Sequence, residues 1–184
     1  AGECPDYPEQ ILSANYRQLC ARVEQVMSDD SDLTKINEHH WQERNPVVTE
    51  ALVQLTTGGP QTIYWGGLAQ GQVRYFDPKE QRPGLPSDVA ALVTRLAPEG
   101  LDLTLVNLNV HATRDVIVGA GSFGEHQFKQ VKAGGSDAPV PVDDRYFQVR
   151  LLPGTEINLH IPMERFCNKP SYAFPWHGGA IPFR

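Results

Sequence analysis

The chain has 184 residues, of which 40% are hydrophobic and 21% are charged, and its formal net charge at pH 7 is -6. This composition is typical of a globular protein that can bury a core, and the length suits one domain with at most a helical addition. The acidic balance without a basic stripe disfavours a nucleic-acid partner, and no apolar stretch approaches the roughly 20 residues of a membrane-spanning helix.

The three cysteines, Cys4, Cys20 and Cys167, form no CxxC spacing, so neither a zinc ribbon nor a thioredoxin-like site is expected. Cys4 and Cys20 could be bridged if the N-terminal segment folds back on the first helix, and the odd total leaves at least one free thiol. No signal peptide is visible, although a mature chain that had lost one would look the same. The location therefore stays open, with an extracytoplasmic one as the working expectation.

The first third of the chain predicts helices. A capping-box pattern, Asp6 with Glu9, and apolar residues at helical spacing predict a first helix that ends at the acidic run 29–32. A shorter helix is expected at residues 33–39. The Asn-Pro dipeptide at residues 45–46 is typical of a helix start, and that third helix would end at the Gly-Gly-Pro stop that follows it.

A first strand is expected at residues 72–77, and Ser87 or Asp88 is expected to cap a short helix that ends near Leu96. After Gly100 the apolar period changes from 3.6 to 2, which is the period of strands. The segments that read as consecutive strands are residues 101–109, 113–121, 125–132, 145–154 and 155–162, with an exposed loop at 133–144.

Short strands in succession without helices between them favour an antiparallel sandwich or barrel. The sequence therefore predicts a mainly β protein, an antiparallel β-sandwich of jelly-roll-like type with an N-terminal helical segment. We place the helical segment at residues 1–66 and the sandwich domain at residues 67–184. The sandwich includes a C-terminal tail that is rich in aromatic residues and has no periodicity.

Aromatic residues outside the predicted strands are the first candidates for a binding site. Tyr64 and Trp65 lie in a glycine-broken loop, and Tyr172 and Trp176 lie in the tail. Flat rings stack on the faces of sugar rings as they do on other apolar surfaces, so these four residues could bind a glycan. Packing of the tail rings onto a sheet face is the alternative.

Histidines are the second candidates. The segments around His126 and His160 resemble the cupin pattern, in which histidines and a glutamate hold a metal inside a β-barrel, and Glu125 or His177 would complete the set. However, the HxH pair of the first cupin motif is missing. In a regular strand, moreover, Glu125 would point outward and His126 inward, while His160 would face outward on its own strand. This favours a hydrogen-bonded structural role for His126, and a transition metal is expected only under the cupin interpretation.

A resemblance rests on the general arrangement of six features along the chain. They are NPVVTEALVQLTTGGPQTIYWGGLAQGQVRYFD at 45–77, LPSDVAALV at 85–93, TLVNLN at 104–109, GSFGEHQF at 121–128, the Pro-Gly hairpin at 153–154 and NKPSYAFPW at 168–176. Together they resemble the C-terminal region of bacterial six-hairpin (α/α-toroid) glycosidase-like proteins, in which the last toroid helices lead into a β-sandwich cap. The resemblance implies a carbohydrate-related setting. It assigns no catalytic residue, because the acids of such enzymes lie mainly in the toroid.

The main functional expectation is an accessory or subunit module of a carbohydrate-active system that binds glycan or docks on a catalytic protein partner. Such a module would need no cofactor and would not be catalytic on its own; if catalytic, it would be related to glycoside hydrolases or be a cupin-type metalloenzyme. One alternative is therefore a cupin-like metal-dependent enzyme that uses His126 and His160. The other is a structural protein that forms homo-oligomers through its aromatic tail, since exposed apolar surface seldom stays bare.

Overall fold

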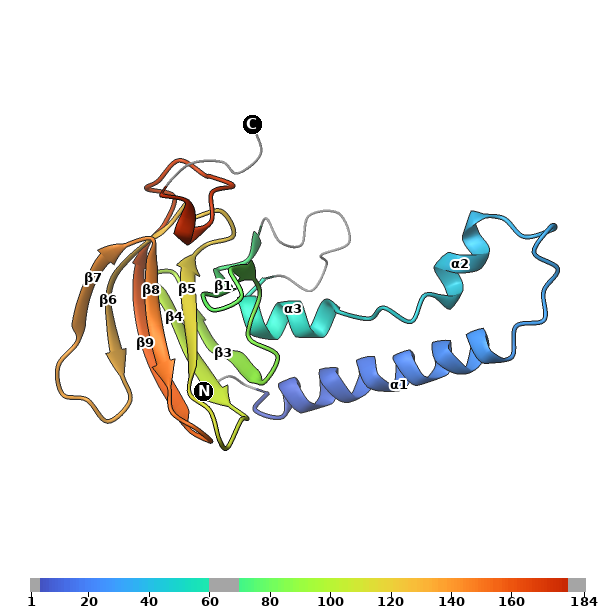
Figure 1. Ribbon diagram of the computed structural model, residues 1–184, viewed down its shortest axis with the longest axis horizontal. Coiled ribbons are helices and arrows are strands. Elements are labelled where there is room, and N and C mark those ends of the chain that lie inside the picture. The colour runs from blue at the N-terminus through green and yellow to red at the C-terminus, as the bar shows by residue number, and fades with distance from the viewer. Residues whose placement is uncertain (1–3, 60–69, 179–184) are drawn as a thin grey trace. The chain divides into compact units, whose positions relative to one another are not determined.

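The computed structural model describes residues 4–59 and 70–178 (Figure 1). Within these residues three α-helices precede two antiparallel sheets of four and five strands, and strand (35%) exceeds helix (24%). The predicted fold class, a mainly β sandwich with an N-terminal helical segment, is confirmed. None of the helices in the described ranges has the length and apolar character that crossing a membrane requires.

The chain divides into two compact units, which we call the helical unit (Gly2–Leu52) and the sandwich unit (Val53–Arg184). The boundary predicted between residues 66 and 67 lies outside the described residues.

α1 (Tyr7–Met27) is the longest helix, and a proline stands in its first turn as the sequence predicts. The predicted capping box is not formed. Asp6 does not adopt the extended conformation that is usual for an N-cap residue, and its side chain makes no capping hydrogen bond. No residue of α1 is buried, which is unusual for a helix of 21 residues.

α2 (Glu38–Arg44) begins later than the helix predicted at residues 33–39. The reason is a turn before it, in which the carboxylate of Asp32 accepts hydrogen bonds from the backbone N–H (3.0 Å) and the hydroxyl (2.7 Å) of Thr34. The helix starts after this turn, where the side chain of Asn37 accepts a hydrogen bond from the backbone N–H two residues on (3.1 Å).

α3 (Glu50–Thr57) also begins later than predicted, because the Asn45-Pro46 pair does not start a helix. A residue before proline is disfavoured in the helical region, and Asn45 is indeed extended, with ψ at 113°. Its side chain caps a local turn instead, accepting a hydrogen bond from the backbone N–H of Val47 at 2.9 Å.

The strands of the sandwich unit form two sheets, ordered β2-β1-β5-β8 and β3-β4-β9-β6-β7. Their bounds are β1 (Val73–Asp77), β2 (Arg82–Pro83), β3 (Val89–Ala97), β4 (Gly100–Asn107), β5 (Arg114–Ala120), β6 (Gln127–Ala133), β7 (Val140–Asp144), β8 (Tyr146–Leu151) and β9 (Glu156–Glu164). The chain passes from one sheet to the other between β2 and β3, β4 and β5, β5 and β6, β7 and β8, and β8 and β9, which is the jelly-roll-like feature of the sandwich.

Two segments differ from the sequence expectation. β3 occupies the segment where Ser87 or Asp88 is predicted to cap a helix; the apolar run there pairs with β4 along its length through a tight turn. Asp88 instead forms an ion pair with Arg114 at 2.7 Å. The segment 133–144, predicted to be wholly loop, contains β7, which pairs with β6 at the sheet edge.

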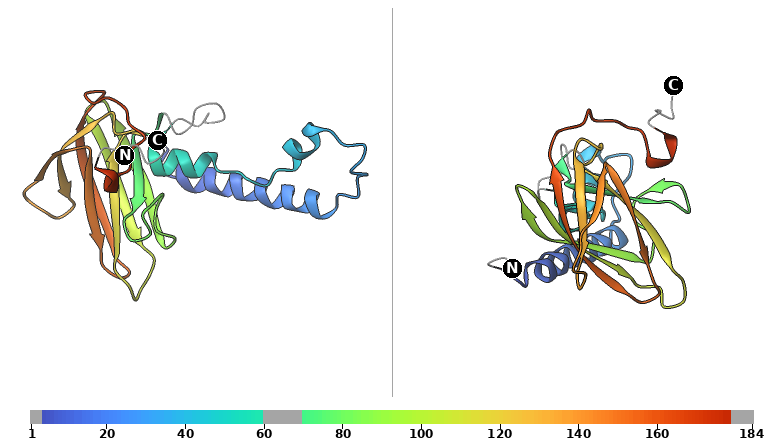
Figure 2. Two further views of the ribbon diagram at one scale, coloured as in Figure 1. Left: turned by 45° about the horizontal axis from the view of Figure 1, so that its top comes forward. Right: turned by 90° about the vertical axis from the view of Figure 1, so that its left-hand side faces the viewer.

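The core lies between the two sheets, whose inner faces pack on each other (Figure 2). Alternate residues of β4 point inward, and Leu101, Leu103 and Leu105 are at most 1% exposed. β5 contributes Val116 and Val118 to the same core from the other sheet, both fully buried. The residues between the three leucines consequently face outward, and one of them, Asp102, lies in the floor of a surface groove.

Candidate functional site

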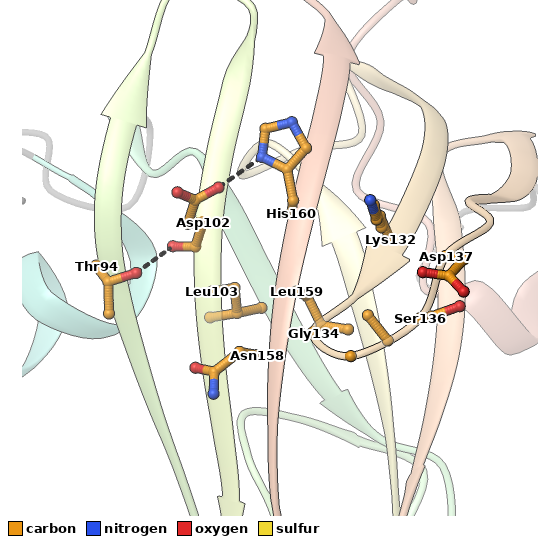
Figure 3. Close-up of a pocket in the computed structure, with 12 residues that line it drawn as sticks. Thr94, Asp102, Leu103, Lys132, Gly134, Ser136, Asp137, Asn158, Leu159 and His160 are labelled. Atoms are coloured by element: carbon orange, nitrogen blue, oxygen red, sulfur yellow. Dashed lines mark hydrogen bonds and ion pairs between the residues drawn. The ribbon is translucent and has the colours of Figure 1, made fainter.

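A polar groove of about 610 Å³ lies on the outer face of the five-stranded sheet (Figure 3). Its floor is formed by outward-facing residues of β4, β9 and β6, and the turn between β6 and β7 forms one wall. The lining residues are Thr94, Asp102, Leu103, Lys132, Ala133, Gly134, Gly135, Ser136, Asp137, Asn158, Leu159 and His160.

Four of the polar side chains near this groove form one row across four strands. Arg95 on β3 pairs in register with Asp102 on β4, Asp102 pairs with His160 on β9, and His160 pairs with Lys132 on β6. We call these four residues the cross-strand row. Because neighbouring strands lie about 4.8 Å apart, the row extends for about 14 Å across the sheet.

Asp102 is the centre of the row. Its carboxylate accepts a hydrogen bond from Arg95 Nε (2.6 Å) through one oxygen and lies 2.6 Å from His160 Nδ1 through the other. The hydrogen bond from Arg95, followed by that from His160, lowers the pKa of Asp102 below its usual value, so the carboxylate is charged at neutral pH. Asp102 thereby holds the imidazole through Nδ1 and directs Nε2 away from itself (Figure 3).

A second pair of polar groups lies beside the row. Thr104 donates a hydrogen bond through its hydroxyl to Asn158 Oδ1 (2.5 Å), and Asn158 Nδ2 donates to Glu156 (2.9 Å). The turn that forms the wall is tied to the same strand, because the backbone N–H of Gly134 donates to the carbonyl of Asn158 at 2.6 Å. The groove is therefore built on paired strands, with polar groups whose positions are fixed by one another.

The chemistry of these groups suits recognition better than nucleophilic catalysis. The hydroxyl of Ser136 donates to the carbonyl of Ala138 (3.1 Å), and that of Thr94 donates to the carbonyl of Asp102 (3.4 Å). In the described lining neither hydroxyl is placed for activation by the His160 imidazole, as a Ser-His-Asp arrangement requires. What the groove offers is a mixture of carboxylate, amide, imidazole and ammonium groups.

The predicted orientation of Glu125 is wrong. Glu125 and His126 are both buried, at 7% and 2% exposure, rather than one facing outward and one inward. β6 begins only at Gln127, and Gly124 has a φ of +68°, so the two residues lie in a turn where strand alternation does not apply. The Glu125 carboxylate accepts hydrogen bonds from the backbone N–H groups of Ser122 (3.2 Å) and Phe123 (2.7 Å).

The prediction of a hydrogen-bonded structural role for His126 is confirmed. Its Nδ1 accepts a hydrogen bond from the backbone N–H of Phe166 (2.9 Å), and its carbonyl accepts one from the Asn168 side chain (2.9 Å). Burial lowers the pKa of His126. The carboxylate of Glu125 lies 3.9 Å from Nε2 of His126, and its negative charge offsets part of this decrease. The pair thus fastens the C-terminal tail to the turn between β5 and β6.

The four residues of the cupin interpretation are not brought together. His126 and Glu125 are buried in the β5–β6 turn, whereas His160 lies on the outer sheet face. His177 lies in the tail, where its ring stacks on Phe174 and its Nδ1 accepts a hydrogen bond from the Phe174 backbone. In the described ranges no group of three or more His, Cys, Asp or Glu residues is arranged to hold a metal ion.

The aromatic candidates differ from one another. Tyr64 and Trp65 lie outside the described residues. Trp176 packs edge-on against Phe76, with ring centroids 5.9 Å apart, so it anchors the tail on the sandwich. Tyr172 is 70% exposed and packs edge-on against Phe123, which leaves much of its surface open to a ligand.

The three cysteines are free thiols, including Cys4 and Cys20, for which the sequence allows a disulfide.

The cross-strand row was not predicted from the sequence. The signal that could have suggested it is the polar half of the alternation: in residues 101–107 and 156–162 every second residue is polar or charged, with few exceptions. What sequence alone does not supply is the register that places Asp102 beside His160 and Lys132.

A comparison with family models finds one match, to a family described as "Domain of unknown function (DUF8034)", over residues 1–53. The match covers less than a third of the chain. It corresponds closely to the helical unit and does not include the groove. No curated protein matches the chain, and no solved structure matches it.

Proposed function

We propose that the sandwich unit is a non-catalytic glycan-binding module and that it binds its ligand in the polar groove of the five-stranded sheet. The observation that carries the proposal is the cross-strand row, in which Asp102, His160 and Lys132 present an acceptor, an imidazole and a donor at regular spacing. The binding site that we propose is therefore the sheet face rather than the aromatic loop and tail that the sequence suggests.

The functional groups of the groove are suited to a neutral, polyhydroxylated ligand. Each sugar hydroxyl both donates and accepts, so neighbouring hydroxyls are satisfied by side chains that carry acceptors and donors side by side, such as Asp102 and Asn158. The groove contains both signs of charge, with Asp102 and Asp137 against Lys132, which gives no preference for a strongly anionic or cationic ligand.

The groove is open and sits on rigid strands, and both properties bear on affinity. An open groove admits an internal stretch of a chain and not only its end, and preorganised polar groups reduce the free-energy cost of ordering on binding. Because few apolar rings line the groove, we expect weak binding, with dissociation constants on the order of 10⁻⁴ to 10⁻³ M.

The test is affinity electrophoresis of the full chain in gels containing neutral polysaccharides, namely a β-1,4-glucan, a β-mannan and starch. We expect at least one of them to retard the protein, and we expect His160→Ala to weaken that binding about tenfold by removing one or two hydrogen bonds. The matched control is Arg150→Ala, which removes an exposed cross-strand partner of Asp115 on the other sheet.

Retardation that is equally sensitive to Arg150→Ala, or insensitive to His160→Ala, would contradict the placement of the site. Retardation that depends on Trp176→Ala alone would move the site to the aromatic tail. If none of the three polysaccharides retards the protein, glycan binding of this class is ruled out.

A further inference from the structure

The helical unit carries an apolar stripe that the unit itself leaves uncovered. We call it the α1 stripe: its members are Leu12, Tyr16, Leu19, Val23 and Val26, which are between 37% and 68% exposed. They follow one another at intervals of four, three, four and three residues. This is the 3.5-residue repeat by which one helix packs along another in a coiled coil.

Another side of α1 is already occupied. The segment that follows α2 returns along the helix: Asn15 Oδ1 accepts a hydrogen bond from the backbone N–H of Ala51 (3.0 Å), and Arg22 donates to the carbonyl of Asn45 (2.8 Å). These contacts fix which side of α1 is covered within the unit. The α1 stripe lies beside the covered side and stays open.

An apolar recess of about 510 Å³ lies at the C-terminal end of the α1 stripe. Its apolar wall is made by Val23, Val26, Met27, Trp41 and Pro46. Met27 is 82% exposed and Trp41 is 53% exposed, so nothing in the unit fills this recess. Towards the N-terminal part of the stripe the ring of Tyr16, 68% exposed, projects from the helix.

We propose that the α1 stripe binds the same stripe of a second copy of this chain, with the two helices antiparallel and each Tyr16 seated in the recess of the other copy. Ten residues separate Tyr16 from Val26, which is about 15 Å along a helix. A two-fold axis midway between them brings each Tyr16 opposite Val26 and each Leu19 opposite Val23. Each of these layers places a larger side chain against a smaller one, which fills space well. Leu12 lies beyond these layers, because its counterpart position follows the end of α1 at Met27.

The surface is large enough, and free enough of charge, for this pairing. The exposed parts of the α1 stripe, Met27 and Trp41 amount to roughly 600 Å² of apolar surface per copy. A standard protein interface buries about 800 Å² per partner, and patches of this size are seldom left bare on monomers. The stripe itself contains no charged residue, so its own layers bring no charges together on pairing. A parallel pairing would instead place Tyr16 against Tyr16.

The first experiment is sedimentation equilibrium of the full chain between about 1 and 300 μM. We expect a reversible monomer–dimer equilibrium with a dissociation constant on the order of 10 μM, given the size of the surface. Val23→Glu should weaken dimerisation at least a hundredfold. The matched control is Ala21→Glu, two residues away on the opposite, exposed side of α1, which should leave it unchanged. Circular dichroism checks that both variants keep their helix.

The second experiment tests the antiparallel register by mixing two variants, Tyr16→Glu and Val26→Lys. Each variant alone should be monomeric, because both of its Tyr16–Val26 contacts are damaged. In the mixture one Tyr16–Val26 contact is replaced by an ion pair and the other is the native one, so a heterodimer should form.

A chain that stays monomeric at 300 μM overturns the proposal, as do equal effects of Val23→Glu and Ala21→Glu on dimerisation. A wild-type dimer whose two variants fail to associate when mixed overturns the antiparallel arrangement.

Discussion

The helical unit and the sandwich unit bury their apolar residues to very different extents. In the sandwich, sixteen buried hydrophobic residues from both sheets form one core, so each inner sheet face is covered by the other. In the helical unit, α1 has no buried residue, and its apolar stripe faces outward. Two sheets can satisfy each other within one chain, whereas a single long helix with a short return segment leaves one side open. The sandwich therefore covers the inner apolar faces of its sheets within one chain. The helical unit leaves an apolar side of α1 exposed, and this is the side to which we propose that a second copy binds.

The largest expected effect is a contrast between one apolar residue of each unit, buried in the sandwich and partly exposed in the helical unit. Phe128 is fully buried and packs against Phe147. Its replacement by alanine should lower the unfolding free energy by about 3 to 5 kcal/mol. Leu19→Ala in the α1 stripe should cost less than about 1 kcal/mol in dilute protein, because 37% of that side chain is already exposed. Urea denaturation at about 1 μM measures both. Equal losses would show that α1 is packed within its own chain after all.

A smaller effect is expected at the glycine turn that carries Glu125. Gly121 has a φ of +82°, and a Cβ at this position would collide with the Glu125 carboxyl group. Gly121→Ala should therefore lower the unfolding free energy by about 2 to 4 kcal/mol. Gly135 is the matched control: its φ is +80°, but a Cβ there would contact nothing, so Gly135→Ala should cost only about 1 kcal/mol. Urea midpoints that shift equally would mean that backbone strain alone decides the outcome.

The smallest expected effect is a pH dependence that belongs to the sandwich. Burial lowers the pKa of His126 below its usual value of 6.5, so the unfolded chain takes up a proton more readily than the folded chain. The stability contributed by neutral His126 is therefore fully present above pH 6.5 and is lost as the pH falls through 6.5 towards the lower folded value. The urea midpoint should fall between pH 7.5 and pH 5.5.

His126→Gln should flatten this pH dependence, because it removes the titrating group and retains an acceptor for the Phe166 N–H. His111→Gln, in an exposed turn, is the control and should leave the slope as it is. A slope that persists in the His126 variant would assign the pH dependence to other groups.

Much of the sandwich could be predicted from the sequence, because strand alternation is a local signal. β1, β5 and β8 fall within the segments predicted as strands, and β4, β6 and β9 extend beyond theirs by only one or two residues. β3 could not be predicted, because its apolar run fits a helix as well as a strand. Only the pairing with β4 makes this segment a strand. The helix starts were misplaced for a similar reason: Asn45 bonds its own turn rather than a helix.

The candidate site was harder to predict than the fold. The alternation rule places Glu125 and His126 on opposite faces only if the strand has already begun, and it begins at Gln127. The cross-strand row depends on the register of four strands, and the residues it joins lie up to 65 positions apart in the chain. Such distant pairings follow from the packing of the whole sandwich and leave no local pattern.

The position of β9 has a consequence for how the protein is made. Among the described residues β9 follows every other strand along the chain, yet it lies between β4 and β6 in the middle of the five-stranded sheet. During synthesis the emerging chain therefore holds two unpaired strand edges until residue 164 has left the ribosome. Open edges of this kind recruit other chains, and strand pairs that are distant in sequence form slowly. Ribosome stalling or premature termination before β9 should consequently yield insoluble product, because both neighbouring strand edges then stay unpaired.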